Sequence, residues 1–112
     1  MAAFQPEPRV NGAMLKQNVG GTVRLVGKIL REVQHDTSTL SVETSDGSQV
    51  NVTLTTDPAT YMNSAFVEVI GKAESNGTVT EYSGVALGGD FDMGLYNQML
   101  ALYNGKYRYL FF

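Results

Sequence analysis

The chain has 112 residues, of which 43% are hydrophobic and 17% charged, and this is the composition of one folded domain spanning residues 1–112. It contains no cysteine, which excludes disulfides and thiolate chemistry. The formal net charge of −3 argues against a protein whose main task is to neutralise the phosphates of a nucleic acid.

The N-terminal part predicts a short helix followed by a strand. Asn11 is a predicted helix cap, and Met14 and Leu15 are expected to anchor this helix, which would close one end of a barrel formed by the strands that follow. The sequence TVRLVGKI at residues 22–29 alternates as a half-buried strand does. Its predicted inward set is Val23, Leu25 and Ile29, and its predicted outward set is Arg24, Val26 and Lys28.

The next two strands are predicted as a hairpin. Residues 39–45 and 49–55 both alternate, and the Asp46–Gly47 pair between them is a strong signal for a tight hairpin turn. The predicted inward side chains are Leu40, Val42, Val50, Val52 and Leu54. A short helical segment is expected at residues 59–64.

Two further strands are predicted at residues 65–73 and 78–87, joined by a tight turn at Asn76 and Gly77. Gly84 is expected to mark a bend or a bulge in the last strand, where the sheet curls. Gly27 and Gly71 suit sharply coiled positions of a small barrel.

This element order predicts an OB-fold, a five-stranded Greek-key barrel. The predicted class is all-β with terminal helices, with the barrel at about residues 20–88 and a C-terminal interaction helix at about residues 92–104. An open antiparallel sheet with a helix on one face is the alternative.

The C-terminal helix is unusually apolar. Asp92 is its predicted N-cap, Phe91 and Tyr96 occupy the two positions of a hydrophobic staple, and no residue from Met93 to Gly105 is charged. Apolar side chains cover roughly half of its circumference, which exceeds what one contact with the barrel uses. Their positions are Met93, Leu95, Tyr96, Met99, Leu100, Leu102 and Tyr103.

Two alternatives stay open for this helix. The whole apolar arc could be internal core, or it could include a surface for other helices. The remaining arc of the helix, which is uncharged but less apolar, would then be part of the contact or the strip that faces water. It holds Gly94, Asn97, Gln98 and Ala101.

Four stretches of the chain resemble the small, third subunit of eukaryotic replication protein A, the heterotrimeric single-stranded DNA-binding complex. They are RVNGAML at 9–15, VRLVGKI at 23–29, FVEVIGKA at 66–73 and FDMGLYNQML at 91–100. The resemblance implies an OB-fold whose C-terminal helix forms a three-helix bundle with one helix each from the middle and large subunits. It implies Met93, Leu95, Tyr96, Met99, Leu100, Leu102 and Tyr103 as subunit-interface residues, and a nuclear protein of DNA replication, repair and recombination. The aromatic tail, Lys106 to Phe112, matches no motif and is expected to be held against the bundle or the barrel.

Direct DNA contact by this chain is predicted to be weak. Single-strand binders of this fold combine a basic groove with aromatic platforms, but the outward positions of the predicted hairpin carry neither. Weak candidates for nucleic-acid contact are Arg24, Lys28, Arg31 and Lys72, with Tyr82 as a possible stacking residue. Single-stranded DNA is therefore expected to be bound mainly through the partner subunits. A stand-alone nucleic-acid binder and a barrel that dimerises through its own helix are the alternative functions.

No catalytic or metal site is predicted. The only histidine, His35, lies in a predicted loop beside Asp36, and no second histidine or cysteine completes a nucleophile or metal set. The glycines lack the spacing of a phosphate-binding loop. We expect no enzymatic activity and no cofactor.

Overall fold

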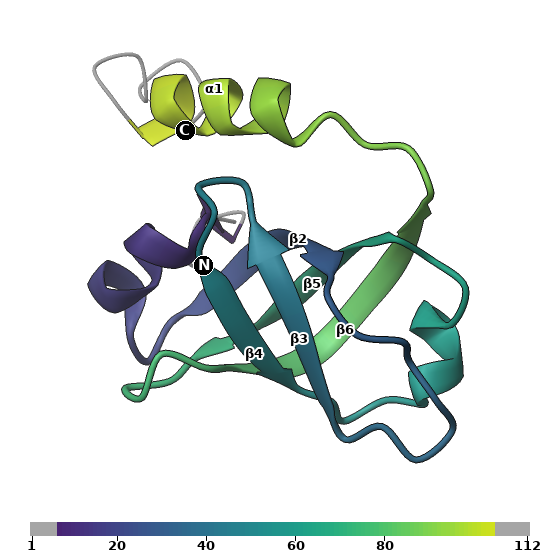
Figure 1. Cartoon of the computed structure of the whole chain (residues 1–112). Coiled ribbons are helices and arrows are strands. Elements are labelled where there is room, and N and C mark those ends of the chain that lie inside the picture. The colour runs from purple at the N-terminus through teal and green to yellow at the C-terminus, as the bar shows by residue number, and fades with distance from the viewer. Residues whose placement is uncertain (1–6, 105–112) are drawn as a thin grey trace, which may run out of the picture.

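The architecture is a closed barrel with a helix above it, in the computed structural model, which describes residues 7–104 (Figure 1). The strands are β1 (Arg9–Val10), β2 (Thr22–Ile29), β3 (Thr39–Thr44), β4 (Gln49–Thr53), β5 (Phe66–Ala73) and β6 (Val79–Gly88). The helices are the 3₁₀ segments η1 (Gly12–Asn18) and η2 (Pro58–Tyr61) and the α-helix α1 (Met93–Asn104). In the described part of the chain, no helix is long and apolar enough to cross a membrane.

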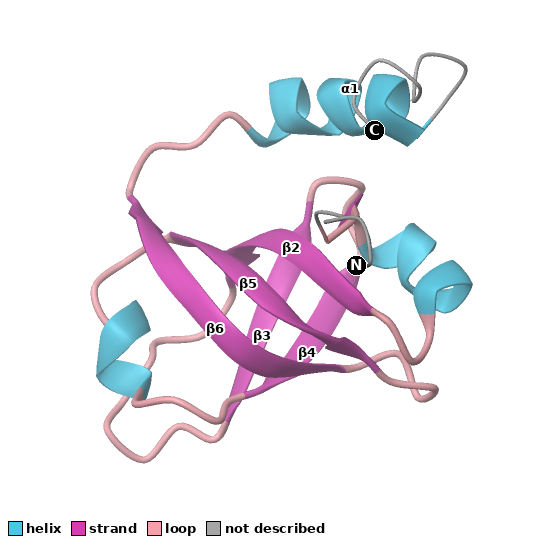
Figure 2. Cartoon of the chain, turned by 180° about the vertical axis from the view of Figure 1, so that it is seen from behind, coloured by secondary structure: helices cyan, strands magenta, loops and turns pink. Residues whose placement is uncertain are grey.

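The pairing of the strands closes the barrel. β2 pairs antiparallel with both β3 and β5, β3 pairs with β4, and β5 pairs with β6. The circuit is completed by a short parallel pairing between β4 and β6, with Val52 opposite Val79. Figure 2 shows the strands wrapped around one another as a barrel. The predicted five-stranded OB-fold barrel is confirmed, and β1, which pairs parallel with β2, is an additional strand.

The core follows the predicted alternation. Val23, Leu25, Leu40, Val42, Val50 and Val52 are all buried in one cluster inside the barrel. Leu15 from η1 joins this cluster, and the Asn11 side chain accepts a hydrogen bond from the Met14 amide at 3.2 Å. The predicted role of η1 in closing the barrel is therefore confirmed.

Of the predicted bend or bulge at Gly84, the bulge does not lie at this residue, which pairs regularly with Val69. The register of β6 against β5 shifts instead between Glu81 and Ser83 and again between Ala86 and Gly88. Gly84 is needed for a different reason: a Cβ there would collide with the hydroxyl end of Tyr61, whose ring is buried in the core. The glycine thus makes room for the end of an aromatic side chain.

The prediction that Val26 faces outward is right for the strand but misleading about its environment. Val26 is buried, because α1 lies over it and covers it with Tyr96 and Leu100. These three residues form a second small apolar cluster outside the barrel, separate from the main core. Part of the apolar surface of α1 is therefore used within the chain.

Candidate subunit interface and nucleic-acid face

The start of α1 is fixed by the local interactions that the sequence predicts. The Asp92 carboxylate accepts a hydrogen bond from the Leu95 amide at 2.9 Å, which makes Asp92 the N-cap. Phe91 and Tyr96 meet edge to face with their ring centroids 5.5 Å apart, and Phe91 also contacts Phe66 of β5 at 5.9 Å. The cap and the staple anchor the first turn of the helix to the barrel.

The predicted interface residues of α1 divide into two groups. Tyr96 and Leu100 are buried against the chain's own barrel, and Met93 and Met99 are half-buried beside them. Leu95 and Leu102 are 63% and 51% exposed. The side chain of Tyr103 lies outside the described residues.

An exposed stripe runs along the side of α1 that faces away from the barrel. It consists of Gly94, Leu95, Gln98, Ala101 and Leu102. At about 100° per residue these positions span an arc of about 120° centred on Gln98, with the two leucines on one flank and the two small residues on the other. An uncharged arc of this kind, with two exposed leucines seven residues apart, has the spacing of helix-packing positions.

Asn97 does not belong to the exposed stripe, although helical periodicity places it in the same uncharged, less apolar arc as Gln98. Its Oδ1 accepts one hydrogen bond from the Ser45 hydroxyl at 2.8 Å and a second, longer one from the side-chain Nδ2 of Asn11 at 3.3 Å. It therefore connects α1 to the turn between β3 and β4 and to the cap of η1. No pattern in the sequence distinguishes Asn97 from Gln98, because both contacts come from residues far away in the chain.

The charge cluster on the outer face of β2 and β5 is internally paired. The Arg24 guanidinium lies 2.8 Å from the Glu68 carboxylate and 3.4 Å from that of Glu7, and Arg9 approaches Glu68 at 3.6 Å. Burial acts to lower the pKa of Arg24, but the carboxylates of Glu68 and Glu7 raise it overall, so the guanidinium stays charged. Arg24 is thus committed to ion pairs on the strand face that α1 partly covers.

The four candidate nucleic-acid contacts do not form one basic groove. Lys28 is exposed on β2, and the buried Val26 lies between it and Arg24 along the strand. Lys72 lies 3.8 Å from Glu74 in an exposed pair. Arg31 stands apart from the others, in the loop after β2. By register Arg24, Lys28 and Lys72 share the outer face of β2 and β5, but carboxylates beside Arg24 and Lys72 interrupt its positive charge, and Arg31 lies apart from them.

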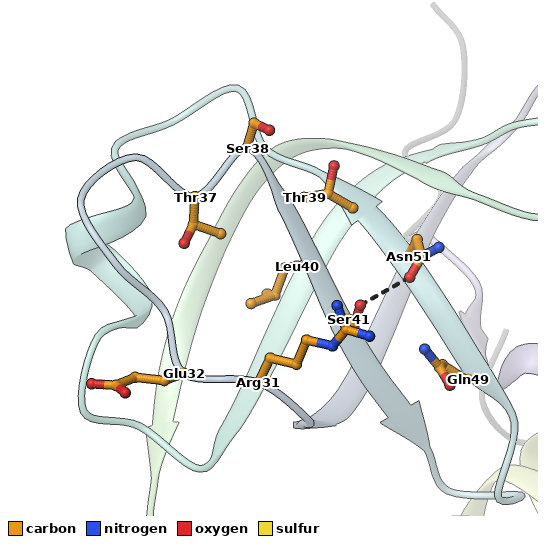
Figure 3. Close-up of a pocket in the computed structure, with 9 residues that line it drawn as sticks. All are labelled: Arg31, Glu32, Thr37, Ser38, Thr39, Leu40, Ser41, Gln49 and Asn51. Atoms are coloured by element: carbon orange, nitrogen blue, oxygen red, sulfur yellow. Dashed lines mark hydrogen bonds between the residues drawn. The ribbon is translucent and has the colours of Figure 1, made fainter.

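Arg31 lines a polar hollow of about 450 Å³ on the outer face of β3 and β4. Figure 3 shows its side chain reaching across β3 toward Ser41, whose hydroxyl bonds Asn51 at 3.0 Å. Most of its lining consists of hydroxyl and amide side chains, with one guanidinium and one carboxylate, and it contains no aromatic ring. The lining residues are Arg31, Glu32, Thr37, Ser38, Thr39, Leu40, Ser41, Gln49 and Asn51. This is the face on which OB-folds commonly bind oligonucleotides, but it lacks the stacking platforms that such binding uses.

The other titratable side chains offer no metal cage. Within residues 7–104 no group of three or more histidine, cysteine, aspartate or glutamate side chains could hold a metal ion. His35 and Asp36 are both exposed in the loop between β2 and β3.

A buried carboxylate that the sequence did not single out lies at η2. Glu81 of β6 is fully buried and accepts hydrogen bonds from the amides of Thr55 and Thr56, each at 2.9 Å, and from the Tyr61 hydroxyl. Burial alone would raise the pKa of Glu81, but these hydrogen bonds together hold it below its ordinary value. The Leu54 amide still bonds the Ser38 carbonyl at 2.9 Å, and only the two amides after it turn to this carboxylate as the chain leaves the sheet.

Comparison with known proteins agrees with the fold and with the resemblance. The family model described as Replication factor A protein 3 matches residues 1–111. The chain is 32% identical over 111 residues to a Replication protein A 14 kDa subunit of Arabidopsis thaliana, with 99% of each chain covered. It is 33% identical over 108 residues to Replication factor A protein 3 of Schizosaccharomyces pombe, with 96% of this chain and 97% of the relative covered.

Solved structures extend the comparison. A chain in the structure of Ustilago maydis replication protein A bound to ssDNA is 32% identical and superposes with a TM-score of 0.76, covering 91% of this chain and 96% of that one. The telomere capping protein Ten1 from Saccharomyces pombe superposes with a TM-score of 0.60 at 14% identity, covering 86% of this chain and 95% of that one. The second likeness concerns the fold alone.

Proposed function

Because the chain belongs to the Replication factor A protein 3 family, we propose that it is the structural small subunit of a heterotrimeric single-stranded DNA-binding complex. In this proposal α1 joins one helix from the middle subunit and one from the large subunit in a three-helix bundle. The complex would act in the nucleus, in DNA replication, repair and recombination.

The observation that carries this proposal is the exposed stripe of α1. Burying two leucines that are more than half exposed would contribute on the order of 1 kcal/mol or more each. The stripe is also two-sided: Leu95 and Leu102 offer bulky side chains to one neighbour, while Gly94 and Ala101 allow a second backbone to approach closely. Two flanks with different packing requirements suit two different partner helices better than one.

The barrel supports a structural role in DNA binding rather than a leading one. A related chain was solved within a replication protein A complex bound to ssDNA, so we propose that this chain meets DNA within such an assembly. Its own hollow at Arg31 lacks aromatic rings, and Arg24 is paired with Glu68. The partner subunits would therefore supply most of the DNA-binding surface, and this chain would supply no catalytic step.

Charge substitution in the exposed stripe tests the bundle. We expect Leu95→Asp and Leu102→Asp each to prevent co-purification with co-expressed middle and large subunits, because a carboxylate would be buried between helices without a partner. Leu30→Asp is the matched control, since Leu30 is 42% exposed and lies in a loop away from α1.

The same experiment separates the alternatives. Circular dichroism of each purified variant should retain the strand signal, because Leu95 and Leu102 lie outside both apolar clusters. Full assembly of Leu95→Asp with both subunits would show that α1 does not form the subunit interface. A stable homodimer of the wild-type chain that persists in the presence of both subunits would favour the self-dimerising barrel instead.

A further inference from the structure

Asn97 is the side chain through which α1 hydrogen-bonds the turn between β3 and β4 and the cap of η1. Its Oδ1 is shared by two donors from different parts of the fold, the Ser45 hydroxyl at 2.8 Å and the Asn11 side-chain amide at 3.3 Å. We call the set of Asn97, Ser45 and Asn11 the polar clamp.

The two anchor points of the polar clamp are themselves held in place. Asn11 is buried and caps η1 through the Met14 amide. Next to Ser45, the Asp46 carboxylate accepts hydrogen bonds from the Thr44 hydroxyl at 2.5 Å and from the Ala13 amide at 3.1 Å. The turn between β3 and β4, which rises toward α1 in Figure 1, is thereby tied to η1. Asn97 thus bonds a rigid platform and not a free loop.

The apolar contact of α1 does not by itself fix how the helix is rotated. Tyr96 and Leu100 bury their side chains against Val26, and the Tyr96 hydroxyl is buried near Arg9. The larger part of this contact is apolar, and apolar burial is non-directional and tolerates rolling of the helix. Asn97 lies on the flank of this buried face, about 100° from both Tyr96 and Gln98. A directional hydrogen bond at the flank permits one rotation and breaks when the helix rolls.

We propose that Asn97 is the positioning residue that sets the rotation of α1 on the barrel, so that the exposed stripe is presented to the partner helices. The inference rests on the proposed function for the identity of the partners, but the clamp itself acts in the free chain. Loss of the acceptor at position 97 would let α1 roll and turn Leu95 and Leu102 away from the orientation that assembly requires.

Two substitutions of similar size separate the acceptor from the volume of the side chain. Asn97→Asp keeps an oxygen that accepts from both Ser45 and Asn11, whereas Asn97→Leu removes it. The chain also offers a matched control, because Asn51 likewise accepts a serine hydroxyl, that of Ser41 at 3.0 Å, on the exposed face of the hairpin. Asn51→Leu removes the same kind of bond away from α1. Asn11 is not substituted, since it also caps η1.

The first readout is amide hydrogen exchange in the free chain. We expect Asn97→Leu to speed exchange across α1 by about ten-fold, the factor for two lost hydrogen bonds of modest net strength, while exchange in the barrel strands stays unchanged. Asn97→Asp and Asn51→Leu should leave exchange in α1 within about three-fold of the wild-type rate. Equal exchange of α1 in Asn97→Leu and the wild type would overturn the proposal.

The second readout is the affinity for the middle and large subunits, measured well below the melting temperature of each variant. We expect Asn97→Leu to weaken binding by about ten-fold and Asn97→Asp to restore it to near the wild-type value. An Asn97→Leu chain that is less heat-stable but assembles with unchanged affinity would show a purely structural role and refute the positioning role. If the wild type and Asn51→Leu also fail to assemble, the proposed function fails, while the exchange experiment still decides whether the clamp holds α1.

Discussion

Glu81 shows how one buried side chain organises the segment between two strands. Its carboxylate is fully buried, and its oxygens accept hydrogen bonds from backbone amides after β4, from the Thr56 hydroxyl and from Tyr61. Burial and the neighbouring carboxylate both raise the pKa of Tyr61, so the phenol remains a donor at neutral pH. A buried charge is stable here because its acceptor positions are occupied by donors that the fold supplies.

Glu81→Gln should destabilise the chain and change its response to acid. The amide group of glutamine would face backbone donors with a donor of its own, so we expect a loss of about 1–3 kcal/mol in the free energy of unfolding by urea. The pKa of Glu81 is lowered by folding, so its contribution is present above its unfolded pKa and is lost as the pH falls through the folded value.

The acid limb of the stability curve, in which the free energy of unfolding decreases as the pH falls, should therefore be shallower in Glu81→Gln than in the wild type. Glu43→Gln is the control, because Glu43 is exposed on β3. Identical unfolding free energies and identical acid limbs for Glu81→Gln and Glu43→Gln would contradict the role assigned to the network.

At the scale of one element, α1 combines ends that are encoded locally with faces that are not. Asp92, Phe91 and Tyr96 could be assigned from the sequence because a cap and a staple involve residues within five positions of one another. The division of the helix into a buried face and an exposed stripe could not, since it depends on Val26 lying beneath Tyr96 and Leu100. Periodicity identified the excess of apolar surface, and only the fold shows which part of it remains open.

Asp92→Ala should loosen the first turn of α1 without affecting the barrel. Removing an N-cap costs about 1 kcal/mol, so we expect amide exchange in this turn to increase by about five-fold. Asp90→Ala is the matched control, because Asp90 is an exposed aspartate two residues earlier and outside the helix. Equal exchange in the two variants would mean that the hydrogen bond from the Leu95 amide does not hold this end of α1 in solution.

At the scale of the whole molecule, local sequence patterns predicted the barrel, and long-range contacts decided its surface. The strands and the Asp46–Gly47 turn follow from alternation and from turn chemistry between near neighbours. The pairing of Arg24 with Glu68 and the bond between Asn11 and Asn97 join residues 44 and 86 positions apart. Such contacts leave no periodic pattern in the sequence. Arg24 could therefore be predicted as a candidate DNA contact, but its ion pair with Glu68 could not be predicted.

This pairing leads to a specific expectation for DNA binding by the free chain. Affinity for single strands needs unpaired cations and stacked aromatic rings, and the described outer face of β3 and β4 offers Arg31 without a ring beside it. We therefore expect no sub-micromolar binding of a fluorescein-labelled oligothymidylate to the isolated chain at about 0.15 M salt.

At low salt, where weak contacts become measurable, Arg31→Ala should reduce the residual binding more than Arg24→Ala, because Arg24 already neutralises Glu68 at 2.8 Å. The trimer should bind the same oligonucleotide tightly, and Arg31→Ala should change that affinity little, since most of the phosphates would be contacted by the partner subunits. The isolated wild-type chain could instead bind DNA with sub-micromolar affinity and lose this binding in Arg31→Ala. That result would contradict the proposal that the partner subunits make most of the DNA contacts, and it would make the hollow on β3 and β4 a principal DNA site.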